Sequence, residues 1–177
     1  MTSPLLESAI EELRKVKTLA DRSIEQLDDA QLRARLDPDA NSVAILMRHL
    51  AGNMRSRWTD FRTTDGEKPN RQRDHEFAEI EVTRAQLLAE WDDGWQRVFS
   101  ALSSVTDANL QDIVHIRQEP HTIHRAILRQ IVHYSGHVYQ IVLLAKHWKG
   151  AEWQTLSIPR GQSDAFNRRM SAMPRPE

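Results

Sequence analysis

Apolar residues recur at steps of three and four along four segments of the chain. The first segment opens with Pro4, where a helix tolerates proline, and its stripe runs through Leu6, Ile10, Leu13, Val16, Ala20, Ile24 and Leu27. The same spacing appears at residues 41–58, Thr83–Leu102 and Thr122–Trp148. Such spacing places apolar side chains on one face of an α-helix, and these faces pack together. The pattern therefore predicts an all-α protein, and four such helices favour a four-helix bundle.

The connections between these segments are long and polar. They comprise residues 28–40, 62–76 and 106–121, and the middle one contains Asp65-Gly66 and Pro69, which are typical of turns. Asp112 to Arg117 alternate apolar and polar residues, but six residues alone do not predict a sheet. We therefore expect long loops rather than the tight turns of a minimal bundle.

A change in pattern near residue 150 separates the bundle from a C-terminal extension. Residues 1–150 hold the four predicted helices, and residues 151–177 contain Pro159 and Gly161, which oppose regular structure. Because Trp153 and Phe166 offer apolar surface, we expect an irregular tail packed on the bundle. At 177 residues the whole chain is most simply a single domain.

Composition narrows the classes of function. The net charge is −1, so no overall field favours nucleic acid or an anionic membrane. The arginines of residues 55–76 alternate with acidic residues, and we interpret them as a solvated, mixed surface. The longest apolar run, Ile141 to Ala145, is far short of the ~20 residues that span a bilayer, and the first residues lack the pattern of a signal peptide. We expect a soluble, cytoplasmic protein.

The absence of cysteine decides which chemistry the chain itself can supply. Without cysteine there are no disulfides, no thiolate nucleophiles and no sulfur ligands for a metal. Any site for a soft metal must therefore use histidine, and any thiol must come from a substrate.

Three histidines fall on the inner faces of two predicted helices. His133 and His137 are four residues apart, which places them about 40° apart around the helix axis and about 6 Å along it. Two imidazoles so placed can hold one divalent cation, and His49 from a facing helix would add a third ligand. Three protein ligands leave a coordination position open, which is typical of a catalytic rather than a structural metal site.

The alternative for each histidine is an ordinary hydrogen-bonded residue of the core. For a single inward histidine that alternative is the better one. A pair four residues apart plus a third favours metal binding, because three buried imidazoles without a shared partner carry a large desolvation cost. The other five lie outside this arrangement, and we expect surface or packing roles for them: His75, His115, His121, His124 and His147.

The residues around the histidines resemble a known family. His-Leu-Ala-Gly-Asn at residues 49–53, and His-xxx-His followed three residues on by Gln140, resemble the DinB (damage-inducible) superfamily over essentially the whole chain. The strings MRHLAGNMRSRWTDF, TTDGEKP, HYSGHVYQIVLLAK and LSIPRG further resemble an uncharacterised bacterial branch of it. The resemblance implies a four-helix bundle with His49, His133 and His137 as metal ligands. Because dimers are common among such relatives, it also implies a homodimer.

Further side chains near the histidines are candidates for contacts with the ligands or the substrate. Tyr139 departs from the pattern of the branch, where glycine is frequent, and it could narrow a pocket or place a phenol near the metal. Arg55 or Arg57 could steer carboxylates of a substrate. The candidates are Asn53, Arg57, Trp58, Tyr134, Tyr139 and Gln140. No residue matches a general base.

Two functions remain open at this level. One is a metal-dependent transferase, with a low-molecular-weight thiol as co-substrate, or a hydrolase acting on a small molecule. The other is a non-catalytic metal-binding stress-response bundle or a dimeric interaction protein. Imidazole ligands suit zinc, nickel or iron, so the sequence predicts one divalent transition metal without choosing among them.

Overall fold

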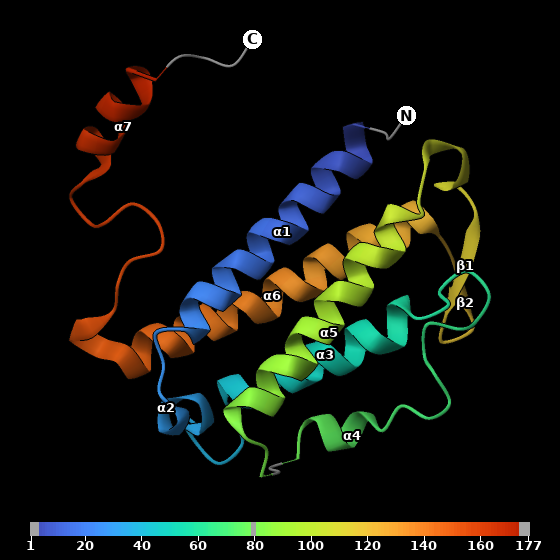
Figure 1. Cartoon of the computed structure of the whole chain (residues 1–177), viewed down its shortest axis with the longest axis horizontal. Coiled ribbons are helices and arrows are strands. Elements are labelled where there is room, and N and C mark those ends of the chain that lie inside the picture. The colour runs from blue at the N-terminus through green and yellow to red at the C-terminus, as the bar shows by residue number, and fades with distance from the viewer. Residues whose placement is uncertain (1–3, 79–80, 174–177) are drawn as a thin grey trace.

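The computed structural model describes residues 4–78 and 81–173 and is mostly helical (Figure 1). Parts of both predicted regions, namely residues 1–3 and 174–177, lie outside the described residues. Four long helices match the four periodic segments: α1 (Pro4–Ile24), α3 (Val43–Trp58), α5 (Arg84–Ser103) and α6 (Ile123–Lys149). The shorter elements in the described part are α2 (Asp29–Arg33), α4 (Arg73–Glu76), α7 (Ser163–Ser171), η1 (Asp107–Asn109), η2 (Gly150–Glu152), β1 (Ile113–Ile116) and β2 (Glu119–Thr122).

Capping residues fix where three of the long helices begin. The Ser42 hydroxyl accepts a hydrogen bond from the backbone of Ile45, and Thr122 does the same for Arg125. Thr83 and Gln86 form a reciprocal capping box at the start of α5. These caps satisfy backbone N–H groups that have no partner within the first turn. The predicted starts of these three helices are confirmed.

The long helices pack in pairs. Helix α3 lies along α5, α1 lies along α6, and α6 also contacts α3 (Figure 1). Their inner faces form a core in which Trp91, Trp95 and Tyr134 are among the largest fully buried side chains. The contact of α3 with α6 matters most for function, because the three histidines lie on these two helices.

A small hairpin corrects the prediction for Asp112 to Arg117. Strands β1 and β2 pair antiparallel, with Ile113 opposite Thr122 and Ile116 opposite Glu119. The two-residue turn between them places Arg117 and Gln118 at positive φ, 55° and 65°. Turns of this type usually contain glycine or asparagine, so the sequence carried no turn signal here. The tertiary structure supplies the support, because the Asp65 carboxylate accepts hydrogen bonds from both backbone N–H groups.

The C-terminal extension also differs from its prediction. Trp153 packs against the core, and the backbone of Gln154 exchanges hydrogen bonds with the Gln26 side chain. Residues Ser163–Ser171, however, form helix α7, which has no buried residue and lies apart from the long helices (Figure 1). The prediction of an irregular tail packed on the bundle is therefore wrong for this segment. The residues after Gly161 favour a helix, and the apolar side chains Phe166 and Met170 recur at helical spacing.

No helix in the described ranges combines the length and the apolar character that crossing a membrane would require.

Candidate metal centre

Three histidines meet where α3 faces α6. His49 on α3 and His133 and His137 on α6 each bring one ring nitrogen to within 4.8 Å of the others. Nε2 of His49 lies 3.4 Å from Nε2 of His133. His49 is buried, whereas the other two rings are half-buried. These residues could therefore form a metal site, as the sequence led us to expect.

Two polar side chains orient the histidine rings. Nδ1 of His49 lies 2.9 Å from Oε2 of Glu76, and Nδ1 of His137 lies 2.9 Å from Oε1 of Gln140. A carboxylate and an amide oxygen only accept hydrogen bonds, so in both rings Nδ1 carries the proton. In the neutral ring Nε2 then keeps its lone pair. This is the arrangement by which outer residues hold a metal-binding imidazole.

The spacing of one pair of donor atoms, and the protonation of two rings, suit a transition-metal ion. Zinc binds histidine nitrogen at about 2.0–2.1 Å, so two ligands of a tetrahedral site lie roughly 3.3 Å apart, close to the 3.4 Å between His49 and His133. Burial, reinforced by His137 and His49, lowers the pKa of His133 to about 3. Burial likewise lowers the pKa of His137. Both rings are therefore neutral near pH 7, and metal binding requires neutral imidazole.

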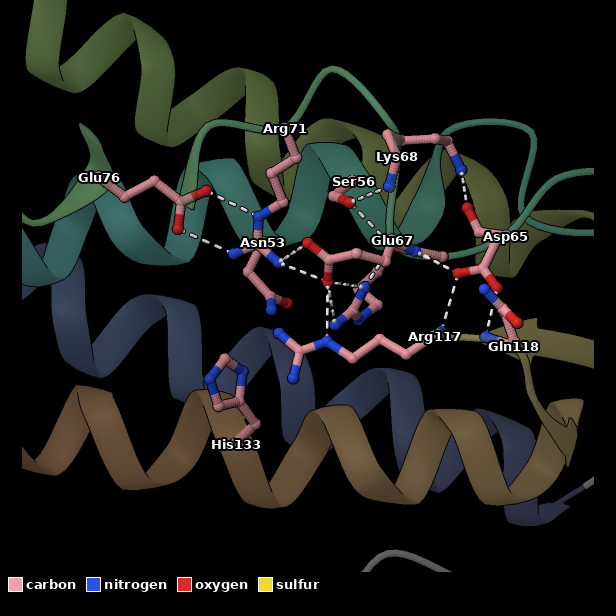
Figure 2. Close-up of polar contacts among 12 residues, drawn as sticks. Asn53, Ser56, Asp65, Glu67, Lys68, Arg71, Glu76, Arg117, Gln118 and His133 are labelled. Carbon is pink, nitrogen blue, oxygen red and sulfur yellow. Dashed lines mark hydrogen bonds and ion pairs between the residues drawn. The ribbon is translucent and has the colours of Figure 1, made fainter. Parts of the chain in front are cut away.

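A network of ion pairs holds Glu76, the partner of His49, and Figure 2 shows its members Glu76, Arg71, Glu67 and Arg117. Arg71 donates to both carboxylate oxygens of Glu76 at 2.8 Å, and it also contacts Glu67. Glu67 in turn pairs with Arg57 and Arg117. Burial opposes ionisation of Glu76, but hydrogen bonds from His49 and Arg71 outweigh it, so the pKa of Glu76 is lowered.

This network corrects the interpretation of residues 55–76 as a solvated surface. The side chains of Arg57 and Arg71 are each 5% exposed, and that of Glu76 is 10% exposed. In the sequence the alternation of charges resembles a solvated face. The loop after α3 folds back over that helix, however, as Figure 2 shows, and the side chains of Arg71 and Glu76 are buried there.

Gly52 permits the close approach of Glu76 to His49. A methyl group at Gly52 would overlap Oε1 of Glu76 and lie 2.7 Å from its Cδ. By contrast, a methyl group at Gly136 would meet nothing within 4 Å. In the described part of the chain, no helix or loop packs closely against Gly136. The carboxylate of Glu76 thus occupies the space that the missing side chain of Gly52 leaves beside His49.

A cavity of about 250 Å³ opens on the histidines. All three rings line it, together with Asn53, Phe77, Gln130 and five arginines. A small molecule in this cavity would lie directly against the nitrogen cluster.

The other candidate residues divide into three groups. Arg57 and Asn53 line the cavity, and Gln140 orients His137. Tyr134 and Trp58 are buried behind it: the indole of Trp58 donates to the Tyr134 hydroxyl at 2.9 Å, and that hydroxyl donates to Asn53 at 3.3 Å. They support the cavity wall rather than line it.

Tyr139 does not belong to the site. Its side chain is 64% exposed and lies in a different hollow, with residues of α1 and the C-terminal extension. The expectation that it narrows the pocket is wrong, because residue 139 is two positions beyond His137, about 200° around the helix axis. Arg55 is likewise turned away, and it pairs with Asp93 on α5.

Sequence reasoning missed Glu76, Gln130 and Arg129. Gln130 shares the helical face of His133, so its position was visible in the spacing. Glu76 carried no comparable signal, because only the path of the loop brings it to His49. Arg129 was missed because only the assembled cavity shows that it lines the same site as the histidines.

Comparison with known proteins gives one match. The model of a family described as a protein of unknown function (DUF1572) matches residues 1–162. No curated protein and no solved structure matches the chain.

Proposed function

Because the chain belongs to the DUF1572 family, whose description carries no activity, we propose a function from the site itself. The protein binds one divalent transition metal through His49, His133 and His137. It uses this metal as a transferase, with a low-molecular-weight thiol as co-substrate, or as a hydrolase of a small molecule. The observation that carries this proposal is the group of three ring nitrogens within 4.8 Å of one another.

The proposal places the chain in the DinB superfamily as a four-helix bundle. Helices α1, α3, α5 and α6 would be the four helices of that bundle, and they pack in pairs. The two histidines four residues apart on α6 face the histidine of α3, as the resemblance implies. The hairpin and α4 would then be additions at one end of the bundle.

The residues of the chain prepare the site for chemistry. A bound divalent ion supplies Lewis acidity, which lowers the pKa of a substrate water or thiol. Glu76 and Gln140 fix the two ring orientations, and Phe77 and Asn53 shape the wall on which a substrate rests. A thiol must arrive with the substrate, because the chain has no cysteine.

The access of small molecules to the three histidines favours a catalytic ion over a purely structural one. Two of the three rings are half-buried, and the cavity reaches all of them. A structural ion is usually enclosed by a full set of protein ligands. Here the described residues offer three.

A second proposal concerns assembly and rests on a different observation. Helix α6 exposes Leu128, Val132, Tyr139 and Leu143, with exposed fractions from 44% to 74%. They recur at steps of four, seven and four residues and so follow one side of the helix. Exposed apolar surface of this kind favours a protein partner. A homodimer through α6 would cover it. Measurement of the molar mass in solution tests this, and a Leu143→Lys, Val132→Lys variant would shift a dimer to monomer.

Elemental analysis of purified protein tests the metal proposal. Wild type should carry or take up about one transition-metal ion per chain. His49→Ala and His133→Ala should each lose it, whereas His124→Ala, on the same helix but outside the cluster, should retain it. Wild type that takes up no metal, or retention by both cluster variants, would reject the site.

Turnover is the next measurement. The metal-loaded protein should accelerate conjugation of a thiol to an electrophile, or hydrolysis, and His133→Ala should abolish this. Full metal occupancy without turnover against a broad panel would favour the non-catalytic function.

A further inference from the structure

The cavity over the histidines is strongly cationic. Five arginines line it: Arg57, Arg71, Arg73, Arg117 and Arg129. They reach it from four different elements, namely α3, the loop before α4 together with α4 itself, the hairpin turn and α6. The convergence of charge therefore depends on the tertiary structure rather than on a local run of sequence.

The carboxylates near the cavity balance only part of this charge. Glu67 pairs with Arg57, Arg71 and Arg117, and Glu76 pairs with Arg71. In the described part of the chain, no carboxylate pairs with Arg73 or Arg129, and Arg73 lies over the ring of Phe77 instead. The five guanidinium groups and the two carboxylates, all within the described ranges, together carry a formal charge of +3.

The effect of this charge is visible at neighbouring groups. Burial lowers the pKa of Arg57, Glu67 opposes this, and the charges of Arg71 and Arg117 lower it further. This mutual repulsion of the guanidinium groups agrees with the excess of arginine over carboxylate that lines the cavity.

Two polar atoms of residues that line the cavity have no hydrogen-bond partner in the part of the chain that the structure describes. Oε1 of Gln130 and Nε of Arg57 are buried and accept or donate no hydrogen bond. Both residues line the cavity, and they are 2% and 7% exposed, respectively. Buried polar groups without partners are costly. Nε of Arg57 is a donor and suits an anionic ligand, whereas Oε1 of Gln130 only accepts hydrogen bonds and gives an anion no contact.

We propose that this cavity binds a small anionic substrate carrying two negative charges, such as a dicarboxylate or a phosphate monoester, next to the histidine cluster. Arg73 and Arg129 are its principal anion-binding residues, because they are exposed and pair with no carboxylate among residues 4–78 and 81–173. Arg117 adds a third guanidinium, which Figure 2 shows between Glu67 and His133. Arginine suits both kinds of anion, since its planar group can bind two oxygens at once.

The size of the cavity restricts the substrate further. Sites for drug-sized ligands measure about 300–1,000 Å³, whereas this cavity holds about 250 Å³. A metabolite of a few carbon atoms fits, and a nucleotide or a peptide is excluded unless most of it lies outside. This inference rests on the proposed function for its reaction, but the anion site itself requires only the arginines.

Titration calorimetry with simple probes tests the proposal on the full chain. Malonate and inorganic phosphate are the dianions, acetate is the singly charged probe, and malonamide is the neutral analogue of malonate. Each is titrated into zinc-loaded and zinc-free protein. Arg73→Gln and Arg129→Gln, singly and together, are compared with Arg125→Gln, which removes the same charge from α6 one turn before Arg129 and outside the cavity.

The dianions should bind more tightly than acetate, and malonamide should not bind. Loss of both arginines should weaken malonate binding by about tenfold or more, because charge-assisted hydrogen bonds are lost. Arg125→Gln should change it by about twofold or less. Malonate binding that is absent, that survives in the double variant, that falls equally in Arg125→Gln, or that malonamide matches would overturn the proposal.

The two proposals can fail separately. Arginine-dependent malonate binding to protein that takes up no zinc would preserve the anion site and reject the metal function. Zinc uptake by a protein that binds no dianion would do the reverse. The zinc content of each variant also shows whether its site is still folded.

Discussion

A single contact, between the ring of His49 and the carboxylate of Glu76, links the metal ligands to the rest of the protein. Glu76 sets the tautomer of His49 and is itself held by Arg71. Arg71 reaches Glu67, which also binds Arg57 and Arg117. The orientation of one imidazole therefore depends on residues from three elements.

Removal of the charge at Glu76 should weaken metal binding without removing a ligand. We expect Glu76→Gln to reduce zinc affinity by about 10- to 100-fold, because it disturbs both the tautomer of His49 and the pairing of Arg71. Competition with a chromophoric chelator measures this. Asp74→Asn, an exposed change on the same short helix, serves as the control, and equal affinity in the two variants would contradict the role of Glu76.

The two helical glycines near the site should respond in opposite ways to alanine. Gly52→Ala must displace Glu76, so we expect a loss of about 1–3 kcal/mol in the free energy of unfolding and weaker zinc binding. Gly136→Ala meets open space and should raise the free energy of unfolding, by up to about 1 kcal/mol. Urea denaturation of both variants measures the difference, and a stable Gly52→Ala with normal zinc affinity would show that Glu76 can move at little cost.

At the scale of elements, the β1–β2 hairpin depends on a residue outside it. Arg117 and Gln118 both occupy the left-handed region, which costs about 1–2 kcal/mol for a residue other than glycine. Asp65 offsets this cost by accepting hydrogen bonds from both backbone N–H groups. The turn of this hairpin places Arg117 in the wall of the cavity.

Asp65→Ala should therefore destabilise the hairpin and the site together. We expect a loss of roughly 1–2 kcal/mol in the free energy of unfolding, because three backbone N–H groups lose their acceptor. Gln118→Gly should recover part of it by removing strain at positive φ. Denaturation of the single and double variants measures this, and no gain from glycine in either background would show that the turn is not strained.

The contribution of Asp65 should also vary with pH. Burial tends to raise the pKa of its carboxyl, but hydrogen bonds from the backbone of Glu67, Gln118 and Arg117 outweigh it, so the pKa lies below the ordinary 3.8. A lowered folded-state pKa means that the stabilisation is complete above the ordinary value and is lost as the pH falls through the folded-state value. The difference in stability between wild type and Asp65→Ala should therefore be constant near pH 7 and shrink below about pH 4. A constant difference down to pH 2 would contradict this.

At the scale of the whole molecule, most of the buried apolar core and all three histidines of the cluster lie on the four long helices. Helix α7 has no buried residue, and the family match ends at residue 162. Deletion of residues 163–177 should therefore leave the free energy of unfolding within about 0.5 kcal/mol of wild type and leave zinc affinity unchanged. Thermal unfolding of the shortened chain and of wild type measures this. A large loss of stability in the shortened chain would show that α7 docks on a partner or on a second copy of the chain.

Metal binding should also tie α3 to α6 across the molecule. An ion that binds only the folded chain stabilises it by about 2.7 kcal/mol at a free concentration 100 times its dissociation constant. The Tm of wild type should therefore rise with zinc concentration and fall with a chelator. The Tm of His133→Ala should respond to neither, and an equal response in that variant would place the ion elsewhere.

The sequence by itself determined the local structure and the central part of the site. Helical periodicity and capping residues predicted the four long helices, because both are set within a few residues of the chain. The spacing of His133 and His137, with His49 on a second apolar stripe, predicted the three residues that meet. All of these signals depend on a short-range geometry that every α-helix shares.

Only the tertiary structure decided what surrounds the histidines. Glu76, Arg117 and Arg129 converge from segments far apart in the chain. The charges of Arg57, Arg71 and Glu76 are buried because the loop after α3 folds back over that helix. The hairpin forms around a turn without glycine because Asp65, some fifty residues earlier, supplies the acceptor. These features depend on the path of connecting segments, which no local periodicity encodes. The charge and the size of the cavity therefore follow from how the elements assemble.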